Sequence, residues 1–279
     1  MKVDYKVYAT LLDSFMDYQD SDAIYDKYWG WSENPPHTPE EFHQLQFQGL
    51  IDKINRVPFD SEAADKGTAF NEVIDCMIEH RNSDKVKIEM VYRHETDFYH
   101  DDVNAPDIDA MPQYKSKEVR GEMIGLKATL NNRTFYFDIN LLREFADYYK
   151  GALTQQYVEA VIHTSKGDVL IYGYIDELMP TSVHDIKTTS QYYVGKFKNH
   201  SQHLVYPYCL IQSGNDIKTF EYNVATIGVN GYQTFTETYV FNPERDIPIL
   251  KNRIEDLIQF VEDNRDLITD KKIFGGEKT

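Results

Sequence analysis

The chain has 279 residues, of which 41% are hydrophobic and 27% are charged, and this is ordinary for a soluble globular protein with an ample buried core. The formal net charge of −17 argues against loose binding of nucleic acid over the whole surface, because such binding rests on cations that meet phosphates. Two cysteines are too few for an iron–sulfur cluster held by four, and no run of about 18 apolar residues exists to cross a membrane.

The N-terminal part of the chain, residues 1–66, is expected to be helical. Apolar residues recur at helical spacing over residues 5–18, and residues 20–39 contain tryptophans and prolines that favour an ordered loop. Thr38 offers an N-cap, with Pro39 at the first helical position and Glu41 three residues after the cap. The pattern therefore predicts a helix from Pro39 to about residue 56.

A second group of elements precedes residue 150. A helix is expected over residues 66–80, followed by a strand over 85–93 and an acidic, proline-containing stretch. Two strands on either side of Asn131-Asn132 predict a hairpin, and a helix follows to residue 150. We interpret residues 94–150 as an insertion before a catalytic core at 151–241.

The core begins with three expected strands, over residues 155–162, 170–176 and 183–187. The last two are joined by a turn and form a short hairpin. Two further strands, over residues 219–227 and 232–241, precede a C-terminal helix over 244–268. We therefore expect one domain over residues 1–279, of α/β (α+β) class, with a mixed sheet flanked by helices.

The hairpin carries three charged residues in a suggestive order. Asp176 closes one apolar run, and Asp185 and Lys187 lie in the next. Residues two apart in a strand share a face, so Asp185 and Lys187 point the same way while Ile186 points to the opposite side. Two carboxylates on adjacent strands make an oxygen-rich pocket for Mg²⁺, and a lysine beside them suits charge that develops on a phosphate. The alternative is a turn aspartate and a solvated ion pair.

The segment after the hairpin adds polar residues to the same region. A helix is expected over residues 196–211, and within it Lys198, Gln202 and Tyr206 are each four apart and share one face. Between His184 and His203 the only acid is Asp185, whereas Lys187, Lys196 and Lys198 are basic. The predicted site is therefore locally basic within an acidic protein.

The strings G-Y-I-D at 173–176, D-I-K-T at 185–188 and Q-x-x-x-Y at 202–206 together resemble the RecB-type branch of the PD-(D/E)xK nuclease superfamily. This resemblance implies that Asp176 and Asp185 are metal ligands and that Lys187 is the catalytic lysine. It also implies that Gln202 and Tyr206 belong to an accessory motif on the DNA side of the site. Thr188 and Lys198 are grouped with these accessory residues.

The same family has an upstream helical motif, G-x-x-x-H followed by Glu. The match here is Gly67 to Glu72, with Asn71 where the family has histidine. An amide oxygen is able to bind Mg²⁺, so Asn71 and Glu72 are expected as further ligands beside the Ile186 carbonyl. Relatives often carry a glutamate on the strand before the hairpin, and Glu159 occupies that place.

The function implied is a Mg²⁺-dependent deoxyribonuclease, with Mn²⁺ as a substitute and no iron–sulfur cluster. An exonuclease is favoured over an endonuclease, in recombination, repair or processing of mobile-element DNA. Its expected partners are DNA and a helicase or recombination protein, without a membrane, in the cytoplasm. Two alternatives stay open: a degenerate nuclease fold that binds DNA or protein without cutting, and an acidic mimic of DNA.

Overall fold

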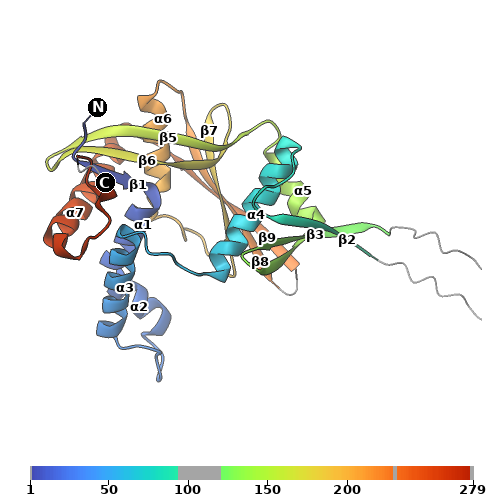
Figure 1. Ribbon diagram of the computed structural model, residues 1–279, viewed down its shortest axis with the longest axis horizontal. Coiled ribbons are helices and arrows are strands. Elements are labelled where there is room, and N and C mark those ends of the chain that lie inside the picture. The colour runs from blue at the N-terminus through green and yellow to red at the C-terminus, as the bar shows by residue number, and fades with distance from the viewer. Residues whose placement is uncertain (1, 94–120, 229–230, 277–279) are drawn as a thin grey trace, which may run out of the picture. The chain divides into compact units, whose positions relative to one another are not determined.

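The computed structural model describes residues 2–93, 121–228 and 231–276, and these residues form an α+β fold with a six-stranded mixed sheet and a separate three-stranded antiparallel sheet (Figure 1). The chain divides into two compact units. The first contains Met1–Ser61 and Gly151–Thr279, and the second contains Glu62–Lys150. The second unit thus begins well before residue 94, where the insertion was expected to start. None of the helices in the described ranges is long and apolar enough to span a membrane.

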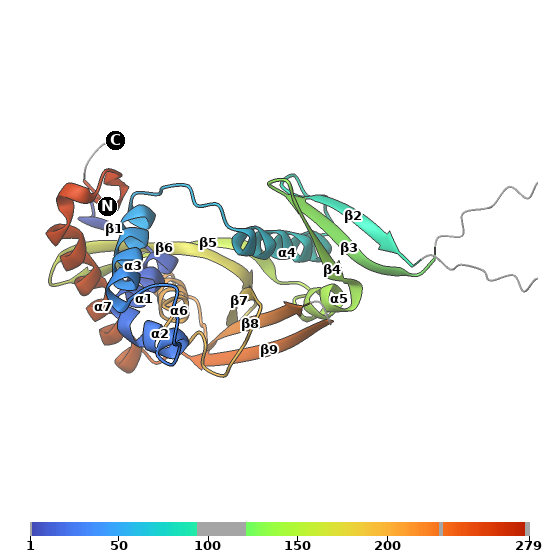
Figure 2. The same cartoon turned by 90° about the horizontal axis from the view of Figure 1, so that it is seen from below.

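The sheet of the first unit is organised around one long strand, β6. Its strands are β1 (Tyr5–Tyr8), β5 (Leu153–Thr164), β6 (Gly167–Leu178), β7 (Ser182–Thr189), β8 (Thr219–Gly228) and β9 (Gly231–Val240). The order is β1-β6-β7-β8-β9, with β5 also paired to β6, and Figure 2 shows how strongly β5 and β6 curve. The pairs β1–β6 and β7–β8 are parallel and the others antiparallel.

Strand β6 changes partner along one edge. Antiparallel β5 follows it from end to end. On the opposite edge the β1 ladder ends at Tyr172, and the β7 ladder begins only at Glu177. The G-Y-I-D segment, residues 173–176, therefore lies in the fork between two ladders. Side chains in such a fork are able to reach backbone groups that a neighbouring strand would otherwise occupy.

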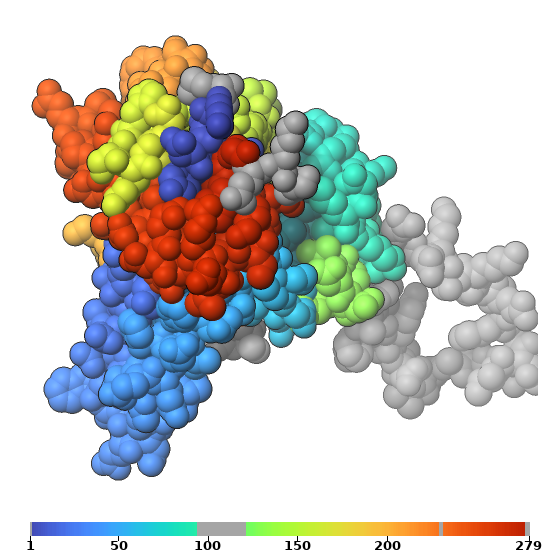
Figure 3. All heavy atoms as spheres, turned by 60° about the vertical axis from the view of Figure 1, so that its left-hand side comes forward, coloured from blue at the N-terminus to red at the C-terminus, as the bar shows by residue number. Residues whose placement is uncertain are grey.

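The described part of the first unit contains the helices α1 (Ala9–Gln19), α2 (Ser21–Trp29), α3 (Pro39–Ile54), α6 (Gln202–Gln212) and α7 (Pro243–Asp263). Short 3₁₀ helices follow α7 at Arg265–Leu267 and Lys271–Ile273. The central helix is α6, which is buried along most of its length and contacts β5, β6, β8, α1 and α7. Figure 3 shows α7, in red, between the β5–β6 strands and the blue N-terminal helices. Aliphatic and aromatic side chains from all these elements form one core.

The second unit has its own small core. It contains α4 (Glu62–Glu79), β2 (Lys87–Tyr92), β3 (Met123–Leu130), β4 (Arg133–Asp138) and α5 (Ile139–Tyr148), with the strand order β2-β3-β4. Phe70 of α4 packs edge-on against Phe137 and Phe145. Asn131 and Asn132 have φ of 49° and 62°, the left-handed pair that a two-residue hairpin turn requires, so the predicted hairpin is confirmed.

Most predicted elements are confirmed, and two differences lie in the N-terminal part of the chain. The predicted N-terminal helix is wrong over Tyr5–Tyr8, which forms β1, because the alternating Y-K-V-Y completes the free edge of β6. The predicted loop after residue 20 contains α2. Ser21, Tyr25 and Trp29 lie four apart on this helix. Because Ser21 is polar, the apolar residues alone do not show a helical spacing in the sequence.

We expect Thr38→Ala to destabilise the protein by about 1 kcal/mol, because the Thr38 hydroxyl accepts the Glu41 N–H at the start of α3. The Glu41 carboxylate in return accepts the Thr38 N–H at 2.9 Å, which completes a capping box. The measurement is urea denaturation, with Thr38→Ser as the control that keeps the hydroxyl. Equal stability of all three proteins would show that the cap contributes nothing.

Candidate active site

Asp176 is the last residue of β6 in the fork between the β1 and β7 ladders, and it lies next to β7. Its carboxylate oxygen Oδ2 accepts the backbone N–H of Ile186 at 2.9 Å. This bond crosses from β6 to β7 one residue before their ladder begins, so it takes the place of a strand-to-strand bond. It also fixes the Asp176 carboxylate beside the strand that carries Asp185 and Lys187. Ile186 itself is 4% exposed, so its side chain is buried.

Asp185 and Lys187 form a pair that is closed by Gln202 of α6. The Lys187 ammonium lies 2.6 Å from Asp185 Oδ2 and donates to Gln202 Oε1 at 2.8 Å. The Gln202 Nε2 group donates to Asp185 Oδ1 and, at 3.4 Å, to the Tyr206 hydroxyl. Only this orientation of the amide faces its oxygen to the ammonium and its NH₂ to the carboxylate. The predicted common face of Gln202 and Tyr206 is therefore confirmed.

A glycine allows Tyr206 to reach this place. A Cβ atom on Gly173 of β6 would lie 2.5 Å from Cε1 of Tyr206 and 3.0 Å from its hydroxyl oxygen. The tyrosine is 3% exposed and packs against Phe220, so its ring has little room to retreat. Gly173, the first residue of the G-Y-I-D string, is therefore required by the close approach of α6 to β6.

The charges of the pair are interdependent. Burial alone lowers the pKa of the Lys187 ammonium, but the nearby carboxylates of Asp185 and Asp176 outweigh burial and raise that pKa above its usual value. Burial, followed by the Asp185 charge, raises the pKa of the Tyr206 hydroxyl. Lys187 is therefore a fixed positive charge, and Tyr206 is a neutral hydroxyl.

The residues in the fork fit part of a cation site. Asp185 is 2% exposed, and its Oδ2 lies 2.6 Å from the Lys187 ammonium. Carboxylate oxygens are ligands for divalent cations, and Mg²⁺ commonly uses one or two carboxylates and completes its shell with water and phosphate. Over residues 2–93, 121–228 and 231–276, no group of three or more His, Cys, Asp or Glu side chains is placed to hold a metal.

The other expected ligands, Asn71 and Glu72, lie on α4 in the second unit. Glu72 is 4% exposed and accepts from Arg81 at 2.6 Å. Burial raises the pKa of the Glu72 carboxyl, but the Arg81 guanidinium outweighs burial and holds that pKa below its usual range. Glu72 is thus already paired within its own unit. A role for Asn71 and Glu72 as metal ligands stays a prediction.

The remaining predicted accessory residues are placed differently from one another. Lys198 does not share the Gln202 face, because the predicted helix starts too early. Residues 194–199 form successive turns, and α6 begins only at Gln202. Thr188 follows Lys187 on β7 and is half-buried. Glu159 is exposed on β5, where it accepts from the Tyr157 hydroxyl at 2.6 Å, and its strand pairs with β6 as expected.

One buried acid near the site has no sequence signal of its own. Asp13 of α1 is 8% exposed, and its Oδ1 accepts the backbone N–H of Ser201, next to Gln202. Burial raises the pKa of the Asp13 carboxyl to about 6, although Lys187 and Lys53 act to lower it. In the sequence Asp13 is one polar residue of an amphipathic helix. Its place near the site follows only from the packing of α1 against α6, which the sequence does not show.

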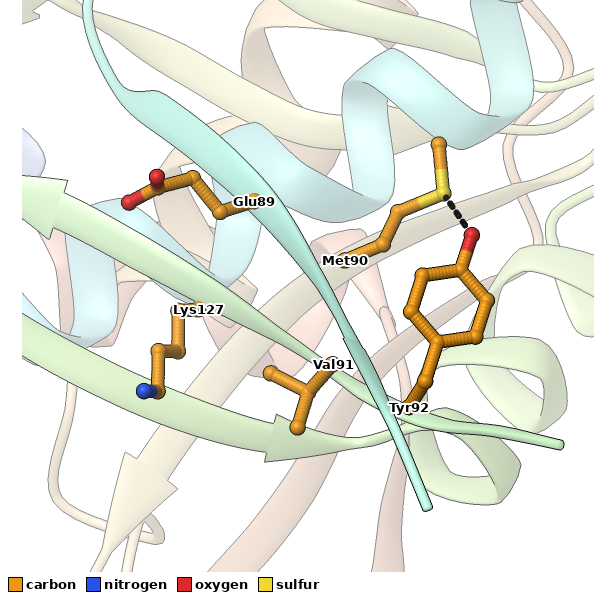
Figure 4. Close-up of a pocket in the computed structure, with 5 residues that line it drawn as sticks. All are labelled: Glu89, Met90, Val91, Tyr92 and Lys127. Carbon is orange, nitrogen blue, oxygen red and sulfur yellow. Dashed lines mark hydrogen bonds between the residues drawn. The ribbon is translucent and has the colours of Figure 1, made fainter. Parts of the chain in front are cut away.

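Two of the pockets have linings that include none of these carboxylates. One, of 340 Å³, is lined in the first unit by Lys198, Asn199, His203, Leu204, Tyr239, Val240, Arg245, Asp246, Ile249 and Arg253. The other, of 330 Å³, lies on β2 and β3 of the second unit. Figure 4 shows its lining residues Glu89, Met90, Val91, Tyr92 and Lys127, with the Tyr92 hydroxyl donating to the Met90 sulfur at 3.0 Å. Of the predicted site residues, these linings include Lys198 alone.

No family model matches the chain, and no curated protein matches it. Among solved structures, the chain is similar to one described as the crystal structure of SSO0001, with 14% sequence identity and a TM-score of 0.33. The matched region covers 44% of this chain and 56% of the SSO0001 chain. A likeness at this level assigns neither fold family nor function.

We expect Gly173→Ala to destabilise the protein by about 1–3 kcal/mol, because the new methyl group collides with the buried Tyr206 ring. The matched control is Gly49→Ala in α3, where a Cβ meets nothing within 4 Å and alanine favours the helix by about 1 kcal/mol. Urea denaturation measures both changes. A Gly173→Ala protein as stable as the Gly49→Ala protein would contradict the close approach of α6 to β6.

Proposed function

We propose that the protein is a metal-dependent deoxyribonuclease that hydrolyses phosphodiester bonds at the fork of β6 and β7. One observation carries the proposal: Asp176, Asp185, Lys187 and Gln202, which the sequence spreads over three elements, converge on one cluster of contacts. The resemblance of their sequence strings to RecB-type nucleases supports the same chemistry.

Each residue has a task that its contacts suit. The carboxylates of Asp176 and Asp185, with the Ile186 carbonyl, would hold Mg²⁺, or Mn²⁺ in its place. The bound ion would supply a Lewis acid for the phosphate and an acidified water. Lys187 carries a permanent positive charge that would stabilise the negative charge developing on the phosphate. Gln202 holds that ammonium from its Oε1 side and so orients it.

The local charge near the site suits an anionic substrate better than the charge of the whole protein does. The protein as a whole repels DNA, since its net charge is −17. Near the site, the loop after β7 carries Lys196 and Lys198, and the Lys196 ammonium donates to the Thr189 hydroxyl at 2.6 Å and the Gln191 carbonyl oxygen at 2.7 Å. DNA would therefore be held by a few local cations and the bound metal. Its binding should weaken with salt only in proportion to the few phosphates that those cations neutralise. An exonuclease that works with a helicase or recombination partner is the form of activity we favour.

A second function has one observation in its favour. Among the described residues, no group of three or more His, Cys, Asp or Glu side chains is placed to hold a metal, and Asn71 replaces the family histidine. A fold that binds DNA or protein without cutting would keep such a reduced site. That function predicts binding of DNA by the wild-type protein with no cleavage in Mg²⁺ or Mn²⁺.

We expect Lys187→Ala to lower the rate of DNA cleavage by about 10²- to 10⁴-fold while the protein stays folded, because the charge beside the phosphate is lost. The assay uses end-labelled linear duplex, single-stranded and closed circular DNA with Mg²⁺, Mn²⁺ or EDTA. Lys218→Ala is the matched control, since this lysine is exposed at the start of β8 and pairs only loosely with Asp216 at 3.7 Å. Cleavage by Lys187→Ala at the wild-type rate would refute the proposed chemistry.

Asp185→Asn tests the cation separately from cleavage. The amide keeps an oxygen but loses the negative charge, so we expect the affinity for Mn²⁺ in calorimetric titration to fall by at least about tenfold. Asp168→Asn, which changes an exposed acid at the far end of β6, should leave that affinity unchanged. Equal Mn²⁺ binding by Asp185→Asn and wild type would remove Asp185 from the metal site.

A further inference from the structure

The start of α6 is held by a carboxylate from another helix. Asp13 of α1 accepts the backbone N–H of Ser201 through Oδ1, across 188 residues of sequence. Ser201 is fully buried and is the N-cap of α6, and its own side chain makes no capping bond there. A negative charge at the N-terminus of a helix is stabilised by the helix dipole. Asp13 is therefore suited to fixing the position at which α6 begins.

The same segment is held from a second side by Arg253 of α7. Its guanidinium Nη1 donates to the carbonyl oxygens of Asn199 and His200, at 3.1 and 3.2 Å, and to the Ser201 hydroxyl at 3.0 Å. Residues 199–201 are thus fastened between a carboxylate and a guanidinium. These bonds leave little freedom for the residue that follows.

That next residue is Gln202. Its side chain contacts both Asp185 and Lys187, so a shift of its Cα of even a fraction of an ångström lengthens one of two hydrogen bonds. We propose that Asp13 is a positioning residue for the Lys187 ammonium, acting through the Ser201 N–H and the Gln202 amide. The inference rests on the proposed function, and it concerns a residue that never touches the substrate.

Asp13 is a buried carboxylate whose neighbours compensate its burial only in part. A buried carboxylate is unfavourable unless charges or hydrogen bonds compensate it, and here burial raises the pKa of Asp13 to about 6. The groups that face it are the Ser201 N–H, Lys53 of α3, Lys187 and Asp185 of β7, and Arg253 of α7. His200 Nδ1 lies 3.7 Å from Oδ2, but burial lowers the pKa of that imidazole to about 3, so it is neutral.

The test compares three replacements of Asp13. Asp13→Asn keeps an oxygen that accepts the Ser201 N–H, whereas Asp13→Ala and Asp13→Leu have none, and leucine fills the space if alanine fails to fold. We expect the two apolar variants to lower kcat for DNA cleavage by about 10- to 100-fold with KM unchanged, and Asp13→Asn to restore kcat to within about threefold of wild type. Asp17→Ala, an exposed acid one turn further along α1, is the control and should match wild type.

A second readout does not need activity. The ¹H and ¹⁵N shifts of the Gln202 side-chain amide report its bond to Asp185, and they should move in Asp13→Ala or Asp13→Leu while remaining at the wild-type position in Asp13→Asn and Asp17→Ala. An unmoved Gln202 amide in the apolar variants would overturn the inference, and so would a loss of kcat in Asp13→Asn as large as in Asp13→Ala. If the wild-type protein cuts no DNA, the proposed function fails, and the amide shifts alone decide whether Asp13 positions Gln202.

Discussion

The Gln202 side-chain amide is the contact on which the candidate site depends. Asp185 is almost fully buried and Lys187 is largely so, and buried charges of this kind need hydrogen-bonded partners as well as each other. Gln202 supplies a donor for the carboxylate and an acceptor for the ammonium from one rigid group. Without Gln202, Asp185 and Lys187 would each lose a hydrogen-bonding partner and keep only the other charge as a neighbour. The side chain therefore fixes the spacing of the two charges as well as their burial.

The backbone around this amide follows from two features of the first unit. Strand β6 exchanges β1 for β7 along one edge, which opens the fork where Asp176 reaches across to the Ile186 N–H. Helix α6 then approaches β6 at Gly173, where any Cβ would strike Tyr206. Together these features bring the end of one strand, the middle of the next and the first turn of a helix to one point. A site for phosphate chemistry needs that rigidity, since catalysis depends on charges held in place before the substrate arrives.

The sequence predicts the parts of this arrangement that have local signals. The alternation of apolar and polar residues is enough to place Asp176, Asp185 and Lys187 on two paired strands, and the i, i+4 spacing is enough to link Gln202 with Tyr206. Lys198 is misplaced because the helix is predicted to start before it, whereas α6 begins at Gln202. Residue Ser201, at the start of α6, is held by Asp13 and Arg253, which are distant in sequence. Asp13 itself is invisible for the same reason. The strand β1 is missed because a short Y-K-V-Y segment has no periodicity longer than four residues, and the partner edge that stabilises it comes much later in the chain.

The proposed chemistry requires a cation between Asp176 and Asp185, next to the Lys187 charge. The most direct measurement is the anomalous diffraction of Mn²⁺ in crystals of the protein grown with the metal and a short DNA strand. We expect one strong peak in contact with both carboxylates, with a phosphate oxygen of the DNA on its open side and the Lys187 ammonium beside that phosphate. Mn²⁺ bound only at other acidic positions, with the fork carboxylates unchanged and the DNA elsewhere, would contradict it.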